Sequence, residues 1–282
     1  MERRHGSGDE HAVLVGVDGT TTALHAVAWA AAEADAHGAS LTIVHAAPYA
    51  VGERGTRRAA GILGRARAVA QHERPALHVE TRRSEEQPLP ALVEEAGRAR
   101  LLVTGLISET ITDSVLGSVT LGVLGRTSCP LAVIRSSDVA GNGIVVGTSD
   151  VQADAGALAF AFAEAAAHGD ELTVVHADVR RHALPLIPLV EAVGGFSTRF
   201  PQVRVQIDGA RGRAADVLAA RSTGARMLVV GSRGPHNVSR VLLGSTSGTL
   251  VRTSACPVVV VPHEHRGHPA AGAVGHRHDV ST

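Results

Sequence analysis

Short apolar runs alternate along the chain with longer segments in which apolar residues recur at helical spacing. The first run, VLVGV at 13–17, is followed by an alanine-rich segment at 21–38 that ends on glycine. Short runs rich in β-branched residues are typical of buried strands, and a glycine that follows periodic apolar positions indicates a helix C-terminus. The pattern predicts a strand followed by a helix.

The same alternation continues through the first half of the chain. Further strands are predicted at 41–46, 76–82, 101–105 and 131–135, helices at 89–99 and 116–126, and a mobile, partly helical Arg-rich segment at 52–74. Strands that alternate with helices imply a parallel sheet covered by helices on both faces, and right-handed crossovers favour a doubly wound order.

The same order of segments occurs twice along the chain. AVLVGVDGT (12–20) matches GIVVGTSD (143–150), LTIVHAA (41–47) matches LTVVHAD (172–178), and LGSVTLGVLGRTSCPLAVI (116–134) matches LGSTSGTLVRTSACPVVVV (243–261). In the second copy, the pattern predicts helices at 157–168 and 214–221 and a strand at 203–207. Two long copies indicate a duplicated domain. We therefore predict an α/β fold of two tandem, open, five-stranded, Rossmann-like domains, at 10–137 and 142–263, followed by a disordered His-rich tail at 264–282.

The last predicted strand of each copy, LAVIR at 131–135 and VVVVP at 258–262, is strongly apolar. An apolar strand at the edge of a sheet tends to pair with another chain. Docking of the two copies through these edges, or pairing of two chains, would cover both. We expect an intrachain pseudo-dimer, with a homodimer as the alternative and a protein partner that the sequence does not identify.

Composition excludes several classes of function. Aromatic residues make up only 2% of the chain and the formal charge is zero, which argues against nucleic-acid binding. All 27 basic residues are Arg, which excludes a lysine-dependent phosphate loop and a lysine Schiff base. No apolar run approaches the roughly 20 residues that span a bilayer, and the N-terminal apolar stretch is too short for a signal peptide. We expect a soluble, cytoplasmic protein with no membrane partner, whose Cys129 and Cys256 are buried, reduced thiols.

A glycine-rich stretch, GSRGPHNVSRVLLGSTSG at 231–248, directly follows the apolar run MLVV. Ligands of open α/β sheets bind beyond the carboxyl ends of the strands, where this loop is expected to lie. Glycines let backbone amides approach an anion, and a helix N-terminus adds unpaired N–H donors. The stretch therefore indicates a phosphate-bearing ligand, although glycines that serve only turns and helix packing remain the alternative.

Three features together resemble the universal stress protein family: Asp18 at a strand end, His-Ala after the second strand, and the motif G-2x-G-9x-G-[ST] after the fourth. The motif is complete in the second copy, with Gly231, Gly234, Gly244 and Ser245. The resemblance implies binding of ATP, with Mg²⁺ as an optional companion ion, in an open five-stranded domain that commonly dimerises. The residues implied at the second-copy site are Gly147, Thr148, Ser149, Ala177, Val230, Gly231, Ser232, Arg233, Gly234, Gly244, Ser245, Thr246 and Ser247. Ser149 departs from the family, which has an acid there, and Asp150 lies one place too far along.

The first copy keeps the acid, Asp18, but its loop is degenerate. Ser108 stands where the second glycine belongs, only eight residues separate it from Gly117, and the loop carries Glu109 and Asp113. Each carboxylate near a polyphosphate costs on the order of 1 kcal/mol when solvated. We predict weak triphosphate binding there, with Gly117 and Ser118 still able to hold a smaller anion or a nucleoside.

The other polar residues that could serve catalysis or metal binding are interpreted as structural. His45 and His176 are repeat-equivalent and are expected to be packed, hydrogen-bonded residues, and Glu33 and Glu164 are expected on solvent-facing helix surfaces. The five histidines of 263–280 lack a regular ligand spacing, so no metal site is predicted.

Three functions follow from these features. The first is a nucleotide-binding regulatory protein of the stress response, which holds ATP chiefly in its second copy. The second is a slow ATPase, for which the sequence shows no acid–base constellation. The third is a nucleotide-free interaction protein whose loops are relics. We expect a binding protein with no catalytic residues and at most weak ATP hydrolysis.

Overall fold

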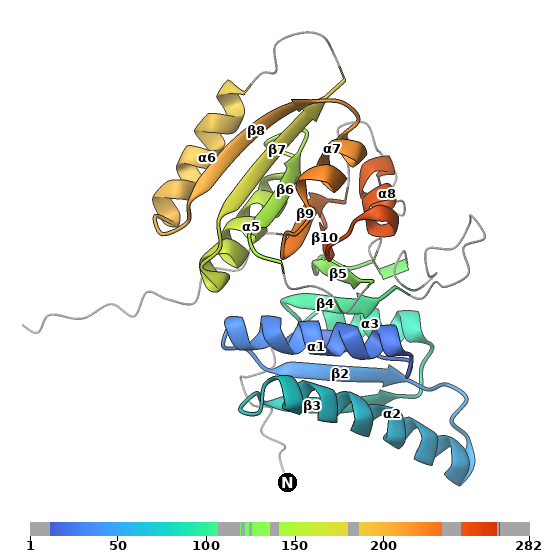
Figure 1. The fold of residues 1–282 in the computed structure, drawn as a ribbon. Helices are drawn as coiled ribbons and strands as arrows, with labels where there is room; N and C mark the ends of the chain where they lie inside the picture. Colours follow the sequence, from blue (N-terminus) through green and yellow to red (C-terminus); the bar gives the residue numbers. More distant parts are fainter. Residues whose placement is uncertain are drawn as a thin grey trace, which may run out of the picture.

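The computed structural model describes residues 12–106, 119, 122–123, 126–135, 141–179, 186–232, 244–263 and 265. Two α/β repeats lie side by side and share one ten-stranded sheet (Figure 1). The first repeat contains β1 (Val13–Gly16), α1 (Thr21–Ala36), β2 (Leu41–Ala46), α2 (Gly52–Glu73), β3 (Val79–Ser84), α3 (Pro88–Ala96), β4 (Leu101–Gly105) and β5 (Leu131–Ile134). The second contains β6 (Ile144–Thr148), α5 (Ala155–His168), β7 (Leu172–Asp178), α6 (Ile187–Arg199), β8 (Val205–Arg211), α7 (Ala214–Arg221), β9 (Met227–Gly231), α8 (Ser245–Thr253) and β10 (Val258–Val261).

The strand order is β3-β2-β1-β4-β5-β10-β9-β6-β7-β8. Neighbouring strands within each repeat are parallel, as the strand–helix alternation predicts. At the centre, β5 and β10 pair antiparallel, with Val133 opposite Val258 and Leu131 opposite Val260. The pairing confirms that the two repeats dock through their last strands, and it removes the two most apolar strands from the sheet edges.

Helices cover both faces of the sheet. Helices α1, α2, α5 and α6 pack over one face, and α3, α7 and α8 pack over the other. The central strands are buried on both faces, which explains why their sequences are continuous apolar runs rather than alternating ones. Ala, Val, Leu and Ile build most of this core, with one aromatic cluster in which Phe162 stacks on Phe196 and Phe200.

The Arg-rich segment predicted to be only partly helical is a continuous helix of 22 residues, α2. Its buried residues, Ala59, Ile62, Leu63, Ala66 and Ala70, recur every three or four positions and pack against the core. The prediction underestimated the helix because this narrow apolar stripe is interleaved with arginines. A helix with such a stripe is stable when its apolar side is buried and its charges face water.

Smaller differences concern element ends. Strands β3 and β8 begin two or three residues later than predicted, at Val79 and Val205, and both run further. Of the predicted helix at 116–126, the structure describes only 119, 122–123 and 126, and most of the tail at 264–282 lies outside the described residues as well. Among the described helices, none is both long and apolar enough to span a bilayer.

Both cysteines are buried, as predicted, and neither forms a disulfide. Burial raises the pKa of the Cys129 thiol to about 12. Because the thiolate is the reactive form, the folded protein should resist alkylation of Cys129 by iodoacetamide at pH 8, whereas the denatured chain should react fully. Mass spectrometry of the alkylated peptide checks this, and rapid labelling of the native protein would contradict it.

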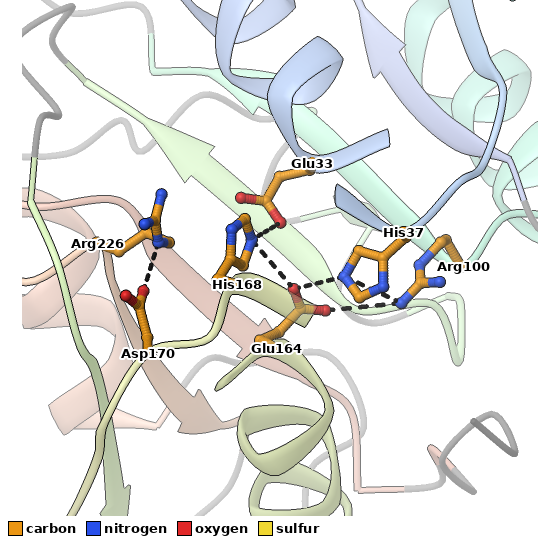
Figure 2. A network of polar contacts seen from close by, with 7 residues as sticks. All are labelled: Glu33, His37, Arg100, Glu164, His168, Asp170 and Arg226. Atoms are coloured by element: carbon orange, nitrogen blue, oxygen red, sulfur yellow. Dashed lines mark hydrogen bonds and ion pairs between the residues drawn. The ribbon is translucent and has the colours of Figure 1, made fainter. Parts of the chain in front are cut away.

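A cluster of ionisable side chains lies between α1 and α5, across the boundary of the two repeats (Figure 2). We call Glu33, His37, Glu164 and His168 the inter-repeat cluster. Nε2 of His37 is 2.8 Å from Oε2 of Glu164, and Nε2 of His168 is 3.1 Å from Oε2 of Glu33. Each histidine therefore contacts the glutamate of the other repeat. The prediction that Glu33 and Glu164 face solvent is wrong, because their side chains are only 2% and 1% exposed.

The helical period explains this burial. Ala26, Ala30 and Glu33 lie on one stripe of α1, and both alanines are fully buried. Residues four and then three positions apart share a helix face, so the stripe that packs on the core carries Glu33 with it. The corresponding stripe of α5 carries Glu164 after Ala157 and Ala161. The charges of Glu33 and Glu164 predicted exposure to solvent, but their positions on the buried stripes of α1 and α5 place them in the interior.

Burial and mutual contacts set the protonation of the cluster. Burial raises the pKa of Glu33, and the neighbouring Glu164 carboxylate adds to this shift. Burial also disfavours ionised Glu164, but the contact with His37 and the charge of Arg100 outweigh it and hold the pKa of Glu164 below its ordinary value. Burial disfavours the charged His168 ring, yet Glu33 raises the pKa of His168. The cluster therefore holds ionised groups that depend on partners from the other repeat.

Candidate nucleotide site

Those predicted second-copy residues that the structure describes lie at one edge of the sheet. Strand β6 lies between β9 and β7, and all three are parallel, so their carboxyl ends share this edge. The chain passes from β6 to β7 on one side and from β9 to β10 on the other, so the strand order reverses between β6 and β9. This reversal point is where open α/β sheets bind ligands. Thr148, Ala177 and Gly231 lie at or beside these strand ends.

The start of α8 is held beside the end of β9. The backbone N–H of Gly244 donates to the carbonyl of Ser232 at 3.1 Å, and the N–H of Ser232 donates to Val261 at 2.9 Å. Gly244 is the N-cap of α8 and has no side chain with which to cap the first turn. The amides of 245–247 have no intrahelical acceptor, as in any first turn, and amides in this position can bind an anion.

The three hydroxyl residues of this turn differ in their surroundings. Ser245 is exposed and Thr246 is half-buried. Ser247 is buried, and its hydroxyl donates to the carbonyl of Gly244 at 3.1 Å. Of the three predicted phosphate donors, the side chains of Ser245 and Thr246 remain candidates. The hydroxyl of Ser247 is committed to the helix start.

A buried carboxylate that the sequence analysis missed organises the end of β6. Asp154 is 4% exposed, and its Oδ2 accepts hydrogen bonds from the N–H groups of Ser149 and Asp150, at 2.8 and 3.1 Å. The hydroxyls of Thr148 and Ser149 also reach this oxygen, each at 3.3 Å. Burial raises the pKa of Asp154, and these hydrogen bonds oppose the rise. The carboxylate fixes the turn in which the family's acid is replaced by serine.

A signal for Asp154 was present in the sequence. Asp is a preferred residue directly before a helix, and Asp154 immediately precedes α5. The predicted helix began at 157, so the aspartate appeared to lie in the loop. Asp150, in contrast, accepts from the N–H groups of Gln152 and Ala153, each at 2.9 Å, and is exposed.

Gly147 has a packing role in the structure. A Cβ on Gly147 would lie 2.6 Å from Cδ1 of Leu218 in α7, so any other residue would require this buried leucine to shift. The same feature recurs in the first repeat, where a Cβ on Gly16 would lie 3.1 Å from Leu92. This favours the alternative interpretation, helix packing, for one of the predicted ligand-lining glycines. Val230 is buried within β9.

The two repeat-equivalent histidines, His45 and His176, are hydrogen-bonded, as predicted. Nδ1 of His45 donates to the carbonyl of Val17 at 2.8 Å, and Nδ1 of His176 donates to that of Thr148 at 3.0 Å. Each bond ties the end of the second strand of its repeat to the end of the first. These residues therefore shape the strand edge on which the candidate site is built.

In the first repeat, Asp18 follows β1 and is exposed. Its Oδ1 accepts from the N–H and the hydroxyl of Thr20, at 2.9 and 2.7 Å, and Thr20 caps α1. Four other predicted residues, Arg233, Gly234, Gly117 and Ser118, lie outside the described residues.

Comparisons with known proteins agree with this architecture. The family model for the universal stress protein family matches residues 11–135 and 191–262. Universal stress protein Rv2005c of Mycobacterium tuberculosis is 30% identical over 286 residues, which cover 89% of this chain and 97% of that protein. The chain belongs to the universal stress protein family.

Two solved structures of the family are also similar. The crystal structure of a universal stress protein from Archaeoglobus fulgidus superposes with a TM-score of 0.73 at 16% identity, covering 92% of this chain and all of that one. A universal stress protein solved in complex with cAMP is 32% identical and covers 45% of this chain and 98% of its own, with a TM-score of 0.38. The first of these confirms the tandem fold over both repeats.

Proposed function

We propose that this universal stress protein binds an adenine nucleotide, ATP, in its second repeat and acts as a nucleotide-dependent regulatory protein in the stress response. The observation that carries the proposal is the complete motif Gly231, Gly234, Gly244 and Ser245, whose described parts meet at the reversal of strand order. The uncapped first turn of α8 supplies amide donors for the phosphates. The proposed contacts are mainly to the backbone, which suits a chain without lysine.

The same geometry favours binding over catalysis. Phosphoryl transfer requires a metal, a group that orients the nucleophile and cationic charge at the γ-phosphate. At the described part of the site, the buried carboxylate of Asp154 is engaged by the turn at Ser149 and Asp150. A Mg²⁺ that accompanied ATP would therefore be held chiefly by the phosphate oxygens. We propose that the protein binds the nucleotide without acting as an enzyme.

Calorimetric titration of ATP and of AMP into the full chain tests the proposal. We expect one site per chain, with ATP the tighter ligand because the loop and the start of α8 hold the phosphates. Release of phosphate above the rate of a protein-free blank would favour the slow ATPase. Absence of heat with both nucleotides, confirmed by equilibrium dialysis, would favour the nucleotide-free interaction protein.

A further inference from the structure

The inter-repeat cluster has a symmetry that ion pairing alone does not require. Glu33 and His37 occupy positions in the first repeat that Glu164 and His168 occupy in the second. In each repeat the two residues are four apart on the end of a helix, so both point to the same side. Figure 2 shows the four side chains converging from α1 and α5 on the boundary between the repeats. The result is a chain of contacts that alternates two carboxylates with two imidazoles, from Glu33 through His168 and Glu164 to His37.

Distances within the cluster approach those of a coordination shell. Oxygen or nitrogen ligands about 2.0–2.2 Å from a tetrahedral ion lie roughly 3.3–3.6 Å from one another. The ligand atoms of Glu33, His37 and Glu164 all lie within 4.8 Å of one another. Nε2 of His168 is 3.1 Å from Glu33 and 3.9 Å from Glu164. The ring centroids of His37 and His168 are 6.3 Å apart, so the two histidines at the helix ends would have to turn toward each other to complete a tetrahedral shell.

The donor set selects a class of cation. Two imidazole nitrogens with two carboxylate oxygens suit Zn²⁺ and neighbouring first-row ions, whereas Mg²⁺ and Ca²⁺ prefer oxygen ligands alone. The two carboxylates are almost completely buried, so a divalent ion would neutralise two charges that water does not reach. Four protein ligands would leave no open position, as in structural rather than catalytic zinc sites.

One hydrogen-bond conflict in the cluster also favours a metal ion. Nε2 of His37 lies 2.8 Å from the Glu164 carboxylate and 3.3 Å from Nη2 of Arg100. A single ring nitrogen cannot both donate to the carboxylate and accept from the guanidinium. A metal ion would accept lone pairs from both His37 and Glu164 and resolve the conflict.

The guanidinium of Arg100 would compete with such an ion for Glu164 and His37. Its Nη2 is 3.7 Å from Oε1 of Glu164, and its side chain is 20% exposed, so it has a path to solvent. The equivalent residue, Arg226, is paired with Asp170 and stands aside from both glutamates in Figure 2. Only the first-repeat arginine would have to turn outward when an ion entered.

We propose that the inter-repeat cluster binds a first-row divalent cation, with Zn²⁺ the best match, and that this ion fastens the two repeats together. Glu33, His37, Glu164 and His168 are its ligands. The ion bridges residues of both repeats, so it stabilises their docking through α1 and α5 as well as through β5 and β10.

The test uses the full chain, stripped with a chelator and titrated with Zn²⁺ and with Co²⁺ as a spectroscopic probe. We expect one equivalent per chain, a raised thermal midpoint, and the intense visible bands of four-coordinate Co²⁺. Glu33→Gln should weaken binding at least about tenfold. The matched control, Glu171→Gln, alters an exposed glutamate and should leave binding unchanged. Arg100→Ala should strengthen binding, because it removes the competing cation.

The tail histidines supply the necessary second control. In a chain carrying His268→Ala, His276→Ala and His278→Ala, the one tight site should persist. Loss of binding in this chain with retention in Glu33→Gln would assign the metal to the tail and overturn the proposal. Weak, six-coordinate Co²⁺ bands in the unaltered chain would overturn it as well, and this readout does not depend on whether any variant folds.

Discussion

Gly234→Asp should abolish detectable ATP binding, with a loss of affinity of at least about 100-fold. The proposed site holds phosphates by backbone amides, and a side chain at the second glycine of the motif would occupy the space through which the backbone approaches the ligand. The added carboxylate would also repel the phosphates by on the order of 1 kcal/mol or more. Calorimetric titration of ATP measures the effect.

The first repeat provides a matched control. Ser108→Asp places the same carboxylate at the equivalent position of the degenerate loop, and it should leave the affinity and the stoichiometry unchanged. Equal losses in the two variants would show that both repeats share the ligand. Loss only in Ser108→Asp would place the nucleotide in the first repeat and refute the proposed function.

Glu164→Gln should destabilise the protein by about 3 kcal/mol, measured by urea unfolding in buffer that contains a chelator. The glutamate is buried beside His37 and Arg100, and removal of one charge from a buried pair leaves its partners without compensation. Because the contacts join α1 to α5, the loss should also lower the cooperativity between the two repeats.

Glu171→Gln is the matched control for this variant. Glu171 also pairs with an arginine, Arg204 at 3.2 Å, but the two side chains are 53% and 85% exposed. Exposed pairs contribute at most about 1 kcal/mol, so this variant should unfold within about 0.5 kcal/mol of the unaltered protein. Similar losses in both variants would show that burial does not set the contribution of Glu164.

The penalty of Glu164→Gln should depend on pH. The pKa of Glu164 is held below the ordinary value of 4.5, because His37 and Arg100 outweigh the effect of burial. A lowered pKa in the folded state stabilises the protein above the unfolded pKa, and this contribution is lost as the pH falls through the folded pKa. The difference in unfolding free energy between Glu164→Gln and the unaltered protein should be complete above pH 4.5. It should shrink as the pH falls below that value. A difference that grows on acidification would contradict this assignment.

Local pattern by itself predicted much of the fold. The repeated alternation of apolar runs and periodic segments predicted two α/β units, because buried parallel strands and amphipathic helices each leave a short-range signature. The apolar character of 131–135 and 258–262 predicted that β5 and β10 would be covered, and they pair with each other. The complete glycine motif predicted which sheet edge the candidate site occupies.

Only the tertiary structure decided the roles of several charged and polar side chains. Glu33 and Glu164 lie on the buried stripes of α1 and α5, but the histidine that each meets comes from the other repeat, and that pairing leaves no signal in the neighbouring sequence. Asp154 turns inward because four donors at the end of β6 converge on it, and Leu218 packs into the space that a Cβ on Gly147 would take. Local sequence thus fixed the elements and their order, whereas the protonation and partners of buried charges depend on segments that fold together from distant parts of the chain.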